Sequence, residues 1–414
     1  MRIALLILAL VLTPALDAQW EIQDSHVTAD LRGIHSLGGG VAWASGSHGT
    51  LLRTEDNGTN WHLCAIPPDA EKLDFRGIQA FDAKTAIVMS SGKGDLSRLY
   101  KTTDGCQTWK LVFTNPDKDG FWDAIQANLA AKRDRFHVLV AGDPVNGSFT
   151  LFYLDVALQG NSKPQLQPFP RLFCRDENIA LQLPLPTRKC VQRVLDITNK
   201  EVAPQNRLKG IPEHYQTPVP RDGEALFAAS NSSLAFGPDV WYAPNISFVT
   251  GGPLGPRFLH LRSTPCAGKG CEEWVKADLP LPKGDAGGAF SLSWKGKDYQ
   301  FGVVVGGDYK KPDEGSGTAA YSEQEGHRRT AATTPPHGYR SAVAYDPTTK
   351  TWITVGPNGT DISTDDGRNW RALEPSPTDA PDADKHWNAL SLPFGVGPHG
   401  RIGLLRPDAL SHTP

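Results

Sequence analysis

This chain has no large excess of positive or negative charge, and it has few long apolar segments. The 42 Lys and Arg residues nearly balance the 45 Asp and Glu residues, which argues against a nucleic-acid binder that works by neutralising phosphates. The apolar run at 3–12 is too short to cross a bilayer. We therefore expect no nucleic-acid partner and no transmembrane segment in the mature chain.

Signals for a metal or a cofactor are also absent. The six cysteines lack paired C-x-x-C spacing and have no histidine in register, which argues against a zinc site. The glycine-rich stretches 38–40 and 251–252 do not form the G-x-G-x-x-G pattern of dinucleotide-binding proteins. We expect neither a metal nor a cofactor.

Turn-forming residues and tryptophan, in contrast, are plentiful. The chain has 41 Gly, 33 Pro and 11 Trp but only 2 Met among its 414 residues. Such a composition is typical of a protein with many turns and few long helices. The length exceeds what one compact core usually holds, so we expect several domains or a repeat architecture.

The N-terminus has the features of a secretory signal peptide. Arg2 precedes the apolar run at 3–12, and a cleavage site before Gln19 would remove 1–18. The alternative is that the run forms a strand of the core. A cleaved signal predicts that the mature chain, 19–414, is periplasmic or secreted.

All six cysteines follow the predicted signal peptide. An even number in an oxidising compartment predicts disulfides, although the sequence alone does not fix their connectivity. Pairing between neighbours along the chain gives Cys64–Cys106, Cys174–Cys190 and Cys266–Cys271.

One octapeptide occurs three times, at 54–61, 102–109 and 363–370, with the pattern S/T-x-D-x-G-x-x-W. The second copy has Cys106 in place of the glycine. The pattern predicts a tight hairpin in which the Asp accepts hydrogen bonds from backbone N–H groups, the Gly adopts a positive φ and the Trp is buried. The residues with these roles are Asp56, Gly58, Trp61, Asp104, Trp109, Asp365, Gly367 and Trp370.

The octapeptide resembles the Asp box of BNR-repeat proteins. Trp61 and Trp109 are 48 residues apart, and Trp274 and Trp370 are 96 apart, twice that distance. A period of this length suits the four-stranded blade of a β-propeller. Degenerate copies fill the gaps, one at 263–274 with extra residues and one at 322–329 with Gln for Asp and Arg for Trp.

Seven phrases along the chain have the pattern of innermost strands. They are 32–35, 76–79, 122–125, 224–230, 290–292, 339–343 and 387–390. We therefore expect an all-β, seven-bladed β-propeller of four-stranded antiparallel blades, in a single domain over 19–414. The last blade lacks a box and a final Trp, so the N-terminal strand from Trp20 is expected to complete it and leave no open edge.

Two segments fit the repeat less well. The stretch at about 157–221 is rich in proline and lacks a box, and we interpret it as an insertion in the third blade. The stretch 123–136 could form a short helix on its pattern alone, but the register of the repeat favours a strand.

Three further phrases, 223–231, 305–309 and 338–345, resemble exported bacterial propellers related to photosystem II stability/assembly factors. The resemblance spans most of the mature chain except the predicted insertion. The best-known members of that family are non-enzymatic assembly chaperones that bind membrane-protein subunits. The resemblance therefore implies a partner-binding protein rather than an enzyme, and we expect a monomer.

Propellers usually bind their ligands at the mouth of the central channel. Charged residues that fall on or beside the predicted inner strands, or at the end of a second strand, are Arg32, Arg76, Asp123, Glu224, Asp308 and Arg340. One interpretation is a solvated ion-pair network in the channel. The other is that Arg32, Arg76 and Arg340 form a basic cluster that binds a carboxylate or an acidic segment through forked hydrogen bonds.

Glycoside hydrolysis is the alternative function. It requires two carboxylates about 5–10 Å apart, and the candidates by position are Asp123, Asp143, Glu224 and Asp308. Sialidases share the Asp box, but they have fewer blades and an R-I-P motif that this sequence lacks. The aspartates of the three octapeptides are turn residues on the outer rim, and we do not expect them to be catalytic.

Overall fold

The computed structural model describes residues 19–129, 134–158, 165–166, 218–237, 245–266, 269–296, 301–323, 328–375 and 379–410. The predicted signal peptide lies outside these residues, and so does most of the predicted insertion. Within the described ranges, no helix is both long enough and apolar enough to span a membrane.

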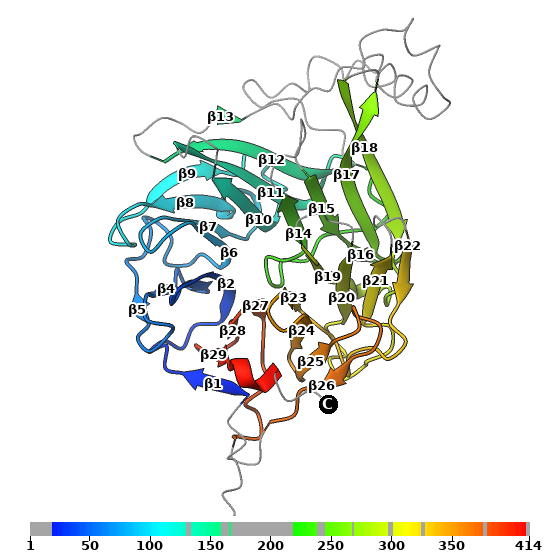
Figure 1. Ribbon diagram of the computed structural model, residues 1–414. Coiled ribbons are helices and arrows are strands. Elements are labelled where there is room, and N and C mark those ends of the chain that lie inside the picture. The colour runs from blue at the N-terminus through cyan, green and yellow to red at the C-terminus, as the bar shows by residue number, and fades with distance from the viewer. Residues whose placement is uncertain are drawn as a thin grey trace, which may run out of the picture.

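The strands form seven sheets arranged in a ring around a central axis (Figure 1). Strands pair antiparallel within each sheet, and each sheet has four strands, except one that gains a fifth strand of two residues. The structure thus confirms the all-β, seven-bladed propeller that the repeat predicts.

The blades follow one another in chain order. Blade one contains β2 (Leu31–Gly38), β3 (Val41–Gly46), β4 (Leu51–Thr54) and β5 (His62–Leu63). Blade two contains β6 (Phe75–Ala80), β7 (Ala86–Ser90), β8 (Arg98–Thr102) and β9 (Lys110–Thr114). Blade three contains β10 (Trp122–Leu129), β11 (Arg135–Val145), β12 (Ser148–Ala157) and β13 (Gln165–Leu166). Blade four contains β14 (Leu234–Gly237), β15 (Asn245–Val249), β17 (Arg257–Cys266) and β18 (Lys269–Asp278). Blade five contains β16 (Gly251–Gly252), β19 (Gly284–Trp294), β20 (Gly302–Asp308), β21 (Ala319–Glu323) and β22 (Arg328–Ala331). Blade six contains β23 (Ala342–Asp346), β24 (Thr351–Gly356), β25 (Gly359–Ser363) and β26 (Arg371–Ala372), and blade seven contains β27 (Ala389–Ser391), β28 (Phe394–Val396), β29 (Ile402–Leu405) and β1 (Trp20–Gln23). Two short 3₁₀ helices, η1 (Gly94–Leu96) and η3 (Pro407–Leu410), complete the described elements.

The N-terminal strand completes the seventh blade, as predicted. β1 pairs with β29, with Trp20 opposite Leu405. The rings of Trp20 and Trp387 lie 4.7 Å apart between their centroids. Gly403 makes room for them, because a Cβ there would lie 2.5 Å from the Trp387 ring and 3.0 Å from the Trp20 ring. The two ends of the chain are therefore joined by strand pairing and by a buried aromatic contact, and β1 supplies the outermost strand of this blade.

The three octapeptides adopt one hairpin geometry. In the first copy, Asp56 Oδ1 accepts hydrogen bonds from the Asn60 N–H at 2.9 Å and from the Thr54 hydroxyl at 2.8 Å. The Thr54 oxygen in turn accepts a bond from the Gly58 N–H at 3.0 Å. The same three bonds recur in the other two copies. The residues at the glycine position all have a positive φ, and they are Gly58, Cys106 and Gly367.

The tryptophan that ends each octapeptide packs against the preceding blade. Trp61 lies against Phe394 of blade seven with ring centroids 5.7 Å apart, and Trp109 lies against Trp43 of blade one at 6.4 Å. Trp370 shares a buried cluster with residues of blade five. These rings fill the seams between blades, so the octapeptide stabilises the ring as well as its own turn.

In blade five an arginine takes the position of that tryptophan. Arg329 is only 9% exposed, and its guanidinium lies over the Phe258 ring of blade four at 4.0 Å and 5.3 Å from the Trp294 ring. None of its three guanidinium nitrogens has a hydrogen-bond partner among the described residues. Burial lowers the pKa of Arg329 to about 9. A cation–π contact thus replaces the aromatic contact at this seam. No hydrogen bond within the described residues offsets the desolvation penalty of the Arg329 guanidinium.

Restoring the aromatic residue at this seam should stabilise the propeller. We expect Arg329→Trp to raise the free energy of unfolding by about 1–2 kcal/mol, because a buried ring replaces a buried cation without a hydrogen-bond partner. Urea unfolding followed by circular dichroism measures the change. Arg329→Met removes the charge without supplying a ring and should gain less. A loss of stability in both variants would contradict this description of the seam.

A disulfide joins blades one and two. Cys64, directly after β5, is bonded to Cys106 in the second octapeptide, and both residues are buried. This confirms the first predicted pairing and explains why a cysteine stands where the other copies have glycine. The other two predicted pairs, Cys174–Cys190 and Cys266–Cys271, have side chains outside the described part of the chain.

Blade three begins with a strand and not with a helix. β10 covers the first part of the stretch 123–136, as the repeat favoured. Gln165–Leu166 pairs with β12 as the outermost strand of the blade. Ala157, Gln165 and Leu166, which fall within the predicted insertion, therefore belong to blade three itself.

The innermost strand of blade four lies later in the chain than predicted. The phrase 224–230 forms turns and a single isolated bridge, Ala225 with Gly251, and the strand β14 follows it. In Figure 1 the green segment that leads into β14 turns into the centre of the ring. We name residues 225–233 the plug. The prediction of a strand was wrong because this segment forms hydrogen bonds across the channel instead of a ladder with its neighbour.

Candidate functional site

A β-bulge occurs at the same place in four inner strands. The pairing register shifts at the second residue of β2, β6 and β10 and at the equivalent residue of β19. The bulged residues are Arg32, Arg76, Asp123 and Phe290. A bulge leaves one residue of the strand unpaired and changes the direction of its side chain, and bulges are frequent next to functional sites. We name this level of the ring, where the inner strands begin, the mouth.

Arg32 and Arg76 occupy the mouth in neighbouring blades, with side chains 30% and 27% exposed. Arg76 donates through Nε to Asp74 at 2.8 Å and through Nη1 to the Ala228 carbonyl of the plug at 3.0 Å. Arg32 approaches Asp30 only to 3.8 Å, and its Nε has no partner in the described ranges. Because Nε is buried, a ligand would contact Arg32 through the partly exposed end of its side chain, which is held only by the long contact with Asp30.

Asp123, which is buried, and Asp143, which is partly exposed, form a carboxyl pair beside Arg76. Asp123 is 2% exposed, and its Oδ2 has no hydrogen-bond partner among the residues that the structure describes. Burial and the charge of Asp143 raise the pKa of Asp123, and the charge of Arg76 opposes that shift. Burial also raises the pKa of Asp143 to about 6, although the Leu226 N–H donates to its Oδ1 at 3.2 Å. The pair therefore retains a proton at mildly acidic pH.

Arg340 and Glu224 are held in buried ion pairs. Arg340 is 0% exposed and donates to Asp361 on β25 through Nε at 2.7 Å and through Nη2. Glu224 accepts a bond from Arg257 Nε at 2.8 Å and another from Arg257 Nη2. Arg340 precedes β23 and turns back towards the third strand of its blade, so it does not reach the surface of the mouth. The expected cluster of three arginines is therefore corrected to the two described above.

The carboxylates considered for glycoside hydrolysis differ in their access to solvent. Asp123 and Glu224 are buried, whereas Asp143 and Asp308 are partly exposed. Asp308 ends β20, where its Oδ1 accepts a bond from the Lys310 N–H at 2.9 Å in a turn. No group of three or more His, Cys, Asp and Glu residues within the described ranges is arranged to hold a metal ion.

Aromatic rings from different parts of the chain lie beside the mouth. Phe227 of the plug stacks on the bulged Phe290 with ring centroids 4.1 Å apart, and Tyr309 lies 6.3 Å from Phe227. Tyr309 is 46% exposed. The buried Tyr339 packs edge-on to Phe290 at 4.8 Å. The mouth thus combines two partly exposed cations with one exposed ring over an aromatic base.

The plug connects blades on opposite sides of the ring. Arg76 of blade two bonds to it as described above. Asn231 Oδ1 accepts a bond from the Ile125 N–H of blade three at 2.7 Å, and the Ser230 hydroxyl donates to the Ser341 carbonyl beside blade six at 2.7 Å. These contacts lie in blades on different sides of the ring, so the plug crosses the channel at this level.

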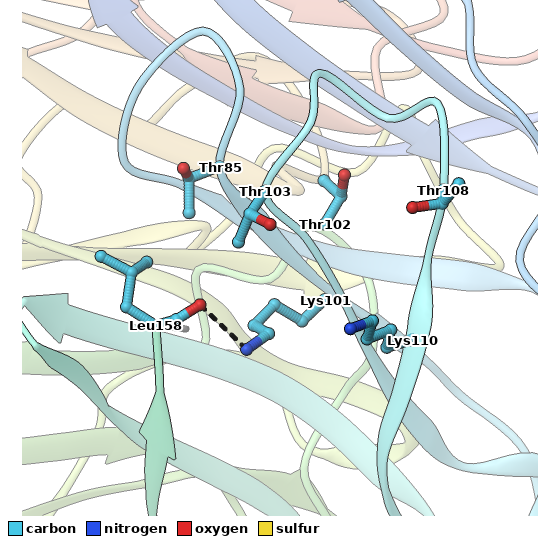
Figure 2. Close-up of a pocket in the computed structure, with 7 residues that line it drawn as sticks. All are labelled: Thr85, Lys101, Thr102, Thr103, Thr108, Lys110 and Leu158. Carbon is cyan, nitrogen blue, oxygen red and sulfur yellow. Dashed lines mark hydrogen bonds between the residues drawn. The ribbon is translucent and has the colours of Figure 1, made fainter. Parts of the chain in front are cut away.

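A separate pocket of about 320 Å³ lies beside the second octapeptide of blade two (Figure 2). Its lining residues are Thr85, Lys101, Thr102, Thr103, Thr108, Lys110 and Leu158. Lys101 Nζ donates to the carbonyls of Ala157 at 2.5 Å and Leu158 at 3.1 Å. Burial and the charge of Lys110 lower the pKa of Lys101. The Lys101 ammonium therefore fastens the end of β12 to blade two, and the pocket shares no lining residue with the mouth.

Comparison with known proteins identifies the fold. No protein-family model and no curated protein matches the sequence. The structure of YCF48 from Cyanidioschyzon merolae matches over 94% of this chain and 100% of its own, with a TM-score of 0.53 and 14% identity. A structure of YCF48 bound to a D1 peptide matches over 95% of this chain and 98% of its own, with a TM-score of 0.50 and 12% identity. The chain has the fold of YCF48.

Within this YCF48-like ring, sequence reasoning located part of the mouth. It identified Arg32 and Arg76 because the same phrase recurs in two blades. It missed Asp30 and Asp74, although the repeat of Asp-x-Arg-Gly-Ile at 30–34 and 74–78 signals both. It also missed the aromatic rings, for which the sequence contains no recurring pattern.

Proposed function

We propose that this protein is a non-enzymatic propeller that binds a segment of a protein partner at the mouth. The observation that carries the proposal is the pair of bulged arginines, Arg32 and Arg76, partly exposed at the same level as the exposed ring of Tyr309. Arginine forks bind carboxylates, and an exposed aromatic ring anchors apolar side chains. This combination suits a segment in which an acidic group lies next to an apolar one.

The kind of partner is proposed by analogy with YCF48. One structure with this fold holds a D1 peptide. We propose that this chain likewise binds a peptide segment, and that the segment belongs to a subunit of a membrane-protein complex whose assembly or stability it supports. Because the analogy rests on fold alone, the proposal is tested by substituting residues of the mouth in this chain.

We also propose that the protein is exported and acts in the periplasm or outside the cell. Arg2, the apolar run at 3–12 and the cleavage site before Gln19 support export. The disulfide between Cys64 and Cys106 fits an oxidising compartment.

Charge reversal at the mouth tests the proposal. The mature protein is crosslinked in envelope extract of the host, recovered, and its partners are quantified by mass spectrometry. We expect the double variant Arg32→Glu/Arg76→Glu to reduce recovery of the partner by about 10-fold or more, because the reversed charges repel an acidic segment.

The matched control is Lys84→Glu/Arg371→Glu, which makes the same change in net charge away from the mouth. Lys84 is exposed in the turn at the far end of β6, and Arg371 is exposed on the outermost strand of blade six. This control should recover the partner as the parent does. Equal recovery with both double variants, or recovery of a glycan in place of a protein, would contradict the proposal.

A further inference from the structure

Two lysines lie directly opposite each other at the pocket beside the second octapeptide. Lys101 of β8 and Lys110 of β9 are partners in the strand ladder of blade two. Both line the pocket of about 320 Å³ (Figure 2). Like charges at directly opposite positions of two strands repel each other. The described residues that line this pocket include no Asp and no Glu, so none of them offsets the two positive charges.

The first octapeptide has a carboxylate at the equivalent position. Arg53 directly precedes it, as Lys101 precedes the second octapeptide. Both cations donate to backbone carbonyls of the next blade, and the bond from Arg53 Nη1 to Ala83 measures 2.7 Å. Arg53 also forms an ion pair with Glu55, the second residue of its octapeptide. The second residue of the other octapeptide is Thr103, which lines the pocket. Blade two therefore has a hydroxyl beside a pocket where blade one has the carboxylate.

Lys101 keeps one donor for a ligand in this pocket. The residue is 8% exposed, and its ammonium has three N–H donors. Two of them are used for the carbonyls of Ala157 and Leu158. Burial and the charge of Lys110 lower the pKa of Lys101. A negative charge beside the two ammonium groups would oppose both effects, because it favours their charged forms.

The threonines of the pocket wall fall into two groups. The hydroxyls of Thr102 and Thr108 donate to Asp104 within the hairpin, at 2.8 Å and 2.5 Å. Those two hydroxyls and both oxygens of the Asp104 carboxylate are therefore used by the turn. Thr85 and Thr103 also line the pocket and take no part in these bonds. Their hydroxyls can donate to an oxygen atom placed between them and the lysines.

We propose that this pocket binds a small oxyanion, which takes the place that the Glu55 carboxylate has in blade one. Lys101 and Lys110 supply the positive charge, and the hydroxyls of Thr85 and Thr103 donate to the remaining oxygen atoms. The volume is at the lower end of the range for small-molecule sites, so the anion is a phosphate or carboxylate group, free or on a small molecule. Phosphate binds more tightly than a monocarboxylate, because it brings more negative charge to two cations.

Isothermal titration calorimetry on the mature protein tests the site. Inorganic phosphate and acetate are titrated separately, in Tris buffer at pH 7 and at constant ionic strength. We expect saturable binding of phosphate with a Kd about 10-fold lower than that of acetate. The opposite order would support the site and identify a carboxylate as its ligand. No saturable binding of either anion would overturn the proposal.

Supplying the acid of blade one tests where the anion binds. Thr103→Glu places a carboxylate beside Lys101, in the way that Glu55 accompanies its arginine, and we expect it to raise the Kd for phosphate by about 10-fold or more. The matched control is Thr364→Glu, at the same position of the third octapeptide, which Ile362 precedes in place of a cation. This control should change the Kd by less than about twofold.

Removal of the second cation gives an independent test. We expect Lys110→Gln to raise the Kd for phosphate by about 10-fold. Lys72→Gln, which removes an exposed charge before β6 in the same blade, should change it by less than about twofold. Undiminished phosphate binding in Thr103→Glu or in Lys110→Gln would overturn the proposal. Because no protein partner is present, these outcomes are independent of the pull-down that tests the proposed function.

Discussion

Replacing Cys64 and Cys106 together by serine is expected to lower the free energy of unfolding by about 4 kcal/mol. The disulfide joins residues 42 positions apart, and closing a loop of that length restricts the unfolded chain by about this amount at room temperature. The bond also crosses a seam, from the end of β5 to the second octapeptide. Urea unfolding of the oxidised parent and of the variant measures the difference.

A second variant separates the crosslink from the strain in the backbone. Cys106 has a φ of 65°, where the other two octapeptides have glycine. A residue with a side chain pays about 1–2 kcal/mol for this conformation. With the disulfide reduced, Cys106→Gly should therefore be more stable than the reduced parent by about 1 kcal/mol. A double serine variant as stable as the oxidised parent would show that the crosslink does not stabilise the ring.

Arg340→Met is expected to lower the free energy of unfolding by about 3–5 kcal/mol. Arg340 is fully buried, and its partner Asp361 is buried with it. Burial opposes ionisation of Asp361, but the hydrogen bond from His337 and the charge of Arg340 outweigh it and lower the pKa of Asp361. Removal of the arginine would leave that carboxylate without its main counter-charge. Thermal and urea unfolding at neutral pH measure the loss.

The double variant Arg340→Met/Asp361→Leu is the control for this ion pair. Replacing both members with apolar residues of similar size is often neutral, because the desolvation penalty disappears together with the attraction. We expect it to recover most of the stability lost in the single variant. If the single variant lost less than about 1 kcal/mol but failed to bind the partner, Arg340 would be a binding residue and not a structural one.

The sequence predicts the architecture of this protein well because the deciding features are local and repeated. The octapeptide places a hydroxyl, a carboxylate and a glycine within one turn, so its hairpin can be derived without knowing the rest of the fold. Its spacing gives the blade, and the missing outer strand of the last blade predicts closure by β1. Arg32 and Arg76 follow from a phrase that recurs at the same place in successive blades.

The parts that the sequence does not predict depend on contacts between distant residues. The phrase 224–230 has the composition of a strand, yet its neighbours in the fold are blades on opposite sides of the channel. The sequence position of Arg340 predicts a channel residue, yet its ion pair with Asp361 on β25 holds its side chain within the blade. In both cases tertiary hydrogen bonds decide the outcome, and no local pattern records them.

Site-specific photocrosslinking tests the central claim, that the mouth binds a protein partner, most directly. A benzophenone amino acid is placed at Tyr309, the exposed ring beside the mouth, and in a second variant at Leu111, which is exposed on the outer strand β9. We predict that illumination in envelope extract links one protein to the Tyr309 variant and that the Leu111 variant does not recover it. Crosslinking of the same protein from Leu111, with none from Tyr309, would place the binding surface on the outer rim and contradict the account.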